Sequence, residues 1–195
     1  MLIYYQRNLP HRLPPGETIF VTFRLAGSLP LEMMTALQQE FAAVPGADDE
    51  AATYARQRRY FGKFDAQLDA AHAGPVWLGQ PAIAQLVQQA LHFSDGRNYQ
   101  LVCYCLMANH VHLVVCLPDN APSLARTLQS LKGYTGRAAN ALLGRTGHFW
   151  QRESYDHVVR NGQELERVIA YVVNNPVKAG LTNDWQQWPY TYWAP

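Results

Sequence analysis

Apolar side chains recur along this chain with two periods, one typical of strands and the other typical of helices. Residues 17–25 are β-branched and aromatic and follow a Pro-Pro-Gly turn, so they predict a first strand. Helical spacing predicts helices over 31–42 and 82–92, and helix-forming residues fill 50–71. A break at Gly74-Pro75 follows the stretch 50–71.

Two strands follow, 99–107 and 110–117, and the short link Ala108-Asn109 predicts a tight hairpin between them. Later elements are a helix from Pro122-Ser123 to about Leu143 and a strand over 153–159. A last helix is predicted from Gln163 to about Asn175. Asn161 and Glu164 form a capping box at its start, and Pro176 ends it. This order predicts an α+β fold: a ferredoxin-like or RRM-like antiparallel sheet with helices packed on it. We expect one domain over 1–195 with a helical insertion at about 30–95.

The composition, 48% hydrophobic and 16% charged residues, is that of a folded protein and excludes a disordered one. Three cysteines in predicted strands indicate buried thiols in a reducing compartment. No apolar run approaches the ~20 residues of a membrane span, and the N-terminus lacks a signal-peptide layout. We therefore expect a cytoplasmic protein with no membrane partner.

Charge is distributed unevenly although the formal net charge is only +1. Residues 123–162 carry six basic and two acidic side chains, whereas residues 1–98 carry eight basic and nine acidic ones. A polyanion is therefore expected to meet mainly the C-terminal half.

Candidate chemistry begins with the segment MANHVHLVV, residues 107–115. On a strand His110 and His112 point to one face while Val111, Leu113 and Val115 point to the other. Two neighbouring imidazoles can bind one metal ion, and the alternative is a pair of hydrogen-bonded histidines on a half-buried face. The H-x-H pattern alone is a weak signal.

The last predicted helix offers partners for this pair. Its core stripe is Leu165, Val168, Ile169 and Val172, and Arg167, Tyr171 and Asn175 form a ridge along its flank. If the ridge faces the histidines, Asn175 can supply a third ligand and Tyr171 can reach what the metal holds. Otherwise Tyr171 is a boundary residue and Asn175 a helix cap.

A tyrosine hydroxyl is a weak nucleophile until a base or a metal assists it. Neutral ligands leave a metal its full charge for an anion such as a phosphodiester, which the metal orients for in-line attack. Attack by tyrosine preserves the bond energy as phosphotyrosine, so a freed 3′-hydroxyl can reverse it.

Five segments in order carry a family resemblance: NHVH (109–112), SLKGYTGRAAN (130–140), FWQRESYDHVVRN (149–161), YVVNNPVKAGL (171–181) and DWQQWPY (184–190). Together they resemble the REP-associated tyrosine transposases, which belong to the HUH (His-hydrophobic-His) endonucleases. Residues 7–30 also look like theirs. The chain departs from the family at Ala108, where a proline is common.

The resemblance implies that His110 and His112 are metal ligands, that Asn175 completes the metal site, and that Tyr171 is the nucleophile. It further implies Mg²⁺ or Mn²⁺ as the cofactor, single-stranded DNA beside hairpins as the substrate, and a 5′-phosphotyrosine intermediate. A bacterial, nucleoid-associated protein acting as a monomer or homodimer follows from it as an expectation.

Tyr134 and Tyr155 are rival nucleophiles, but only Tyr171 has an amide partner one helical turn away. Phosphate contacts and base stacking are expected from a set in the basic region: Arg126, Lys132, Tyr134, Arg137, Arg152 and Arg160.

Two other function classes stay open. One is a catalytically silent, domesticated hairpin-binding protein, which would not need the His110, His112, Tyr171 and Asn175 set. The other is an unrelated H-x-H metalloenzyme for a small molecule, which the basic region and the lack of a third acidic ligand disfavour.

Overall fold

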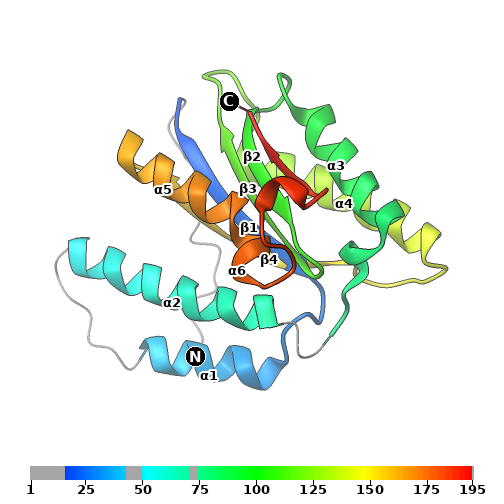
Figure 1. Ribbon diagram of the computed structural model, residues 1–195, viewed down its shortest axis with the longest axis horizontal. Helices are drawn as coiled ribbons and strands as arrows, with labels where there is room; N and C mark the ends of the chain where they lie inside the picture. The colour runs from blue at the N-terminus through cyan, green and yellow to red at the C-terminus, as the bar shows by residue number, and fades with distance from the viewer. Residues whose placement is uncertain (1–15, 43–49, 71–73, 195) are drawn as a thin grey trace.

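The computed structural model describes residues 16–42, 50–70 and 74–194. A single five-stranded sheet forms the centre of the fold, with helices packed on it and with α1 packed on α2 (Figure 1). The strands are β1 (Thr18–Leu25), β2 (Gln100–Leu106), β3 (His110–Cys116), β4 (Trp150–Val159) and β5 (Thr191–Trp193). The helices are α1 (Leu31–Ala42), α2 (Glu50–Ala70), α3 (Pro81–Ser94), α4 (Leu124–Leu142), α5 (Gly162–Val173) and α6 (Asn175–Lys178), with 3₁₀ turns η1 (Trp77–Gly79) and η2 (Trp185–Gln187).

The strand order is β4-β1-β3-β2-β5, and every pair is antiparallel. The first four strands have the order of the predicted ferredoxin-like sheet, so the α+β prediction is confirmed. The predicted hairpin between β2 and β3 is also present, with Leu106 opposite Val111 and Met107 N donating to His110 O at 2.9 Å.

The sheet has two covered faces, and β3 alternates between them. Val111, Leu113 and Val115 belong to the main core, where they meet apolar side chains of α3 and α4. The histidines lie on the opposite face, where Phe20 and Val114 pack with Val172 of α5. Helix α2 reaches this second face through Phe61. The expected alternation of β3 is therefore confirmed.

The main differences from the sequence predictions are two boundaries and one additional strand. Strand β4 begins at Trp150 and so includes a residue of the buried core. Helix α5 ends at Val173, and Pro176 lies in the first turn of α6 rather than after a helix, because proline needs no N–H partner there. The aromatic C-terminal segment adds strand β5 beside β2, and Trp188 Nε1 donates to Leu106 O at 3.0 Å.

Among the described residues, no helix combines the length and the apolar character that crossing a bilayer requires.

Candidate active site

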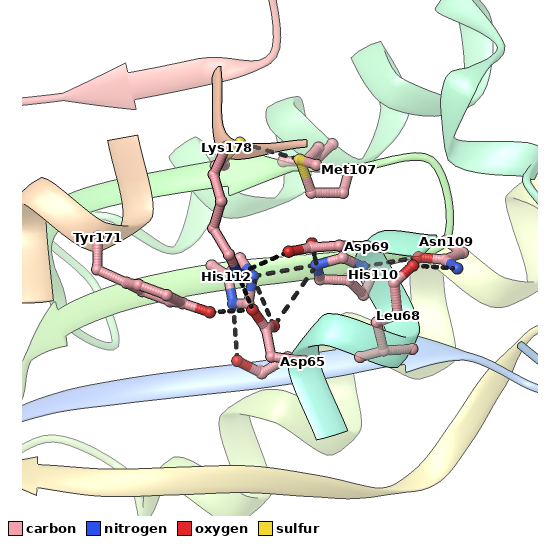
Figure 2. A network of polar contacts seen from close by, with 12 residues as sticks. Asp65, Leu68, Asp69, Met107, Asn109, His110, His112, Tyr171 and Lys178 are labelled. Carbon is pink, nitrogen blue, oxygen red and sulfur yellow. Dashed lines mark hydrogen bonds and ion pairs between the residues drawn. The ribbon is translucent and has the colours of Figure 1, made fainter. Parts of the chain in front are cut away.

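Two fully buried imidazoles from β3 form the centre of the site (Figure 2). His110 Nε2 and His112 Nε2 are 3.0 Å apart, so both point toward one location. Because the two residues alternate with core valine and leucine, the strand itself fixes their common direction.

The other ring nitrogens have polar partners that orient the rings. His112 Nδ1 lies 2.8 Å from Thr22 Oγ1, and His110 Nδ1 lies 2.6 Å from Asn109 Oδ1. Asn109 Nδ2 donates to Leu68 O at 3.0 Å, so Asn109 Oδ1 is left as the acceptor. His110 Nδ1 must then carry the proton, which leaves a lone pair on Nε2 when the ring is neutral.

Helix α2 brings two aspartates against the imidazoles. Asp65 Oδ1 lies 3.2 Å from His112 Nε2 and 4.0 Å from His110 Nε2, and Asp69 Oδ1 lies 3.7 Å from His110 Nε2. Both Oδ1 atoms are buried and have no hydrogen-bond partner among the described residues. Since an unpaired buried carboxylate oxygen is costly, this pattern is typical of a site that holds a cation.

Tyr171 reaches the same carboxylate from α5. Its hydroxyl donates to Asp65 Oδ2, and its ring centroid lies 5.5 Å from that of His112 and 6.0 Å from that of Phe61. Lys178, at the end of α6, donates to Asp69 Oδ2 at 2.8 Å and to Asp65 Oδ2 at 3.3 Å. Figure 2 shows the phenol, the ammonium and the imidazoles converging on Asp65.

Burial controls the charges in this cluster. It lowers the pKa of His110 to about 3, with the neighbouring His112 adding to the effect, so His110 is neutral at pH 7. Burial alone would raise the pKa of Asp65, but His112, His110 and the Tyr171 hydrogen bond together hold this pKa below its ordinary value. Burial and the Asp65 charge raise the pKa of Tyr171. The resting site therefore holds an ionised Asp65 beside a protonated phenol.

The spacings fit a divalent cation. Neighbouring ligands of an octahedral ion with bonds of about 2.1 Å are about 3.0 Å apart, and opposite ligands are about 4.2 Å apart. The distance between the two Nε2 atoms and the distances from each to Asp65 Oδ1 are 3.0, 3.2 and 4.0 Å. His110, His112 and Asp65 therefore form a possible three-residue metal site.

Asn175, the ligand expected from the sequence, is completely buried at the start of α6. Neither its Oδ1 nor its Nδ2 has a hydrogen-bond partner among the described residues. Because α5 ends at Val173, Asn175 does not continue the Tyr171 ridge on one uninterrupted helix as predicted. Its role as a ligand stays a prediction.

The expected DNA-contacting residues fall into two groups. Arg126, Tyr134 and Arg137 are exposed on α4, which packs on the face of the sheet opposite the histidines, and Arg152 and Arg160 are exposed on β4 and directly after it. Lys132 differs, because its ammonium donates to Gln151 O, Arg152 O and Ser154 Oγ. These three acceptors match its three N–H donors, so Lys132 serves to hold α4 against β4.

The rival tyrosines are also separated by the structure. Tyr134 lies on α4 and is 55% exposed, on the far side of the sheet from the histidines. Tyr155 lies on the histidine side, where its ring stacks on Phe61 at 4.3 Å between centroids. The hydroxyl of Tyr171 is bonded to Asp65.

Sequence reasoning missed Asp65, Asp69 and Lys178. It also expected no third acidic ligand, whereas the structure places Asp65 beside the two histidines. The available signal was the pair of aspartates four residues apart on a predicted helix, which places both on one face. Lys178 stood inside the quoted segment 171–181 without a role.

Comparison with known proteins agrees with this architecture. The family model described as "Transposase IS200 like" matches residues 78–175, and the chain belongs to this family. The matched residues include both histidines, Tyr171 and Asn175, whereas Asp65, Asp69 and Lys178 lie outside them.

The chain is similar to two curated REP-associated tyrosine transposases. One, a putative member from Haemophilus influenzae, is 28% identical over 102 residues, 48% of this chain and 58% of that protein. The other, from Escherichia coli K12, is 21% identical over 95 residues, 49% of this chain and 54% of that protein. The chain thus matches little more than half the length of these relatives, and the resemblance seen in the sequence is confirmed.

A solved structure of a REP-associated tyrosine transposase bound to a REP hairpin has the same fold. It matches with a TM-score of 0.56 and 16% identity, covering 91% of this chain and 76% of that one.

Proposed function

We propose that this chain is a metal-assisted, single-strand DNA nicking and strand-transfer enzyme that uses Tyr171 as its nucleophile. The observation that supports this most is the convergence on Asp65, which lies against the His110/His112 pair with one oxygen and accepts the Tyr171 hydrogen bond with the other. The carboxylate of Asp65 therefore connects the proposed nucleophile with the proposed metal site.

In the proposed reaction the phenol oxygen of Tyr171 bonds to phosphorus while the P–O3′ bond breaks. The phenol loses its proton, the 3′-oxygen gains one, and the DNA 5′ end stays attached as a phosphotyrosine. The reverse reaction with a 3′-hydroxyl rejoins a strand without a nucleotide cofactor. Asp65 orients the phenol, and the two histidines would hold the cation.

His110, His112 and Asp65 would hold the cation, with Asn175 as a further proposed ligand. A Mg²⁺ or Mn²⁺ ion there supplies electrostatic stabilisation of the phosphate. The sequence predicted neutral ligands, two imidazoles and an amide, which would leave the ion its full charge. The carboxylate of Asp65 would neutralise part of that charge.

The proposed substrate is single-stranded DNA beside a hairpin. Support comes from the solved relative bound to a REP hairpin and from the exposed positions of Arg126, Tyr134, Arg137, Arg152 and Arg160. Arginines positioned along a surface neutralise backbone phosphates, and an exposed tyrosine can stack on a base.

The test is covalent capture. A 3′-labelled DNA hairpin library with a randomised flanking tetranucleotide is incubated with the chain and Mn²⁺ or Mg²⁺, and adducts are separated on a denaturing gel. We expect a labelled adduct with the unmodified chain, none with Tyr171→Phe, and none with His110→Ala although hairpin binding persists.

An adduct that persists in Tyr171→Phe would move the nucleophile to Tyr155 or Tyr134. Hairpin binding without any adduct from the unmodified chain would refute catalysis and favour the silent, domesticated hairpin-binding protein.

A further inference from the structure

Lys178 is the most exposed charged group of the cluster. Its side chain is 49% exposed, whereas those of Asp65, His110 and His112 are fully buried and that of Asp69 is 10% exposed. We propose that Lys178 is a catalytic residue that binds a non-bridging oxygen of the scissile phosphodiester. This inference rests on the proposed function and adds a substrate-binding group to that site.

The position of the ammonium relative to the phenol supports this role. The Tyr171 hydroxyl and Lys178 Nζ both donate to Asp65 Oδ2, and Nζ lies 5.4 Å from the centre of the tyrosine ring. The two groups are therefore neighbours across a single oxygen atom. A phosphorus atom must come within about 3–3.5 Å of the phenol oxygen before attack. Its non-bridging oxygens then fall within reach of the ammonium.

Charge explains why the phosphate needs this lysine. Asp65 and Asp69 are the acidic groups of the cluster, and Lys178 forms an ion pair with each of them. Carboxylates repel a phosphodiester, and Lys178 and a bound divalent cation would offset this repulsion. Loss of the lysine therefore weakens the attraction of the cluster for the phosphate.

The proposed cation and the Lys178 ammonium occupy different positions around Asp65. The two histidines lie against Asp65 Oδ1 in a fully buried site, whereas Lys178 donates to Oδ2 of the same carboxylate and is half-exposed. A DNA strand arriving from solvent meets the lysine first. The phosphate is then held from two sides, and Lys178 gains the substrate oxygen as an acceptor in addition to Asp69.

The experiment compares the unmodified chain with Lys178→Ala, Lys178→Arg and Lys63→Ala. Lys63 is a matched control, because it is exposed on α2 in an ion pair with Glu40 and lies on the other side of the helix from Asp65. Three quantities are measured: the single-turnover rate of adduct formation at saturating DNA, the hairpin Kd in a Tyr171→Phe background, and the Mn²⁺ Kd by calorimetry.

We expect Lys178→Ala to slow adduct formation by about 10²–10³-fold, the usual loss for one transition-state donor. The hairpin Kd and the Mn²⁺ Kd should stay within about threefold of the unmodified chain, Lys178→Arg should restore at least part of the rate, and Lys63→Ala should change nothing. An adduct rate for Lys178→Ala within threefold of the unmodified chain would overturn the proposal.

A second measurement separates phosphate contact from a structural role. With Mn²⁺, which accepts sulfur as a ligand more readily than Mg²⁺, the two phosphorothioate diastereomers at the cleaved linkage are compared. The unmodified chain and Lys178→Arg should discriminate between them, and Lys178→Ala should not. The proposal would be wrong if Lys178→Ala kept the preference for one diastereomer. It would also be wrong if Lys178→Ala bound Mn²⁺ so weakly that this loss explained its slower adduct formation. Either result would mean that Lys178 has only a structural role. Absence of an adduct from the unmodified chain would instead refute the proposed function itself.

Discussion

Asp65→Asn tests whether helix α2 provides a metal ligand. The substitution keeps the shape of the side chain and an oxygen that can accept the Tyr171 hydrogen bond, but it removes the charge that faces the two imidazoles. Even partners outside the ligand shell change metal affinity by about 10–100-fold, so we expect the loss of an anionic ligand to weaken binding by at least about 100-fold.

That change has a direct thermal consequence. At a Mn²⁺ concentration of about 100 times its Kd, binding stabilises the unmodified chain by about 2.7 kcal/mol, and a Kd raised 100-fold leaves only about 0.4 kcal/mol. For a chain of this length 1 kcal/mol corresponds to about 2–4 °C. Mn²⁺ should therefore raise the Tm of the unmodified chain by about 5–11 °C and that of Asp65→Asn by about 1 °C.

The assay is differential scanning fluorimetry at pH 7.5 with and without Mn²⁺. The metal-induced difference is the quantity compared, because Asp65→Asn also alters the metal-free chain. The folded state lowers the pKa of Asp65, so this carboxylate contributes stability above its ordinary pKa that is lost as the pH falls through the lowered value. Asp69→Asn serves as the matched control, with a smaller loss expected because Asp69 Oδ1 is 3.7 Å from the nearer imidazole. A full metal-induced shift in Asp65→Asn would refute ligation by Asp65.

Three further predictions concern other parts of the chain. Asn109→Ala should weaken Mn²⁺ binding by about 10–100-fold in calorimetry, because His110 loses the acceptor that fixes its tautomer; equal affinity would contradict this argument. Burial raises the pKa of Asp156 to about 7, so the free energy of unfolding should fall as the pH rises from about 4 to about 7. Asp156→Asn should flatten this dependence on pH. In denaturant titrations at pH 8 it should also stabilise the chain by about 1–3 kcal/mol. Arg137→Ala should reduce the slope of log K against log salt for hairpin binding by about 1, and a slope unchanged in fluorescence anisotropy would remove this arginine from the DNA surface.

Most of the fold followed from local pattern. The alternation of β3, the Ala108-Asn109 turn and the Asn161 cap are short-range features, and Asn161 Oδ1 indeed accepts from Glu164 N at 2.9 Å. Strand β5 was missed because three residues give too short a period, and it forms only by pairing with β2. The fold prediction was therefore limited by elements too short to show a recognisable pattern.

The site was less accessible to sequence reasoning. His110, His112 and Tyr171 were recognisable because they stand in motifs, although their catalytic roles stay predictions. Asp65 lies in a polar helix whose composition equally fits an ordinary exposed surface, and its meeting with Tyr171 joins residues more than a hundred positions apart. Such a contact depends on how α2 packs against α5, which no local spacing encodes.

Strand β1, which lies between β4 and β3 in the sheet, has a consequence for biosynthesis. Thr22 is opposite His112 on one side and Tyr155 on the other, so the strand made first pairs only with segments made much later. On the ribosome its apolar residues must wait without partners, which makes β1 a segment of the nascent chain that needs protection from aggregation. Tyr171 and Lys178 emerge later still. Whatever chemistry the cluster performs, a partly synthesised chain cannot perform it.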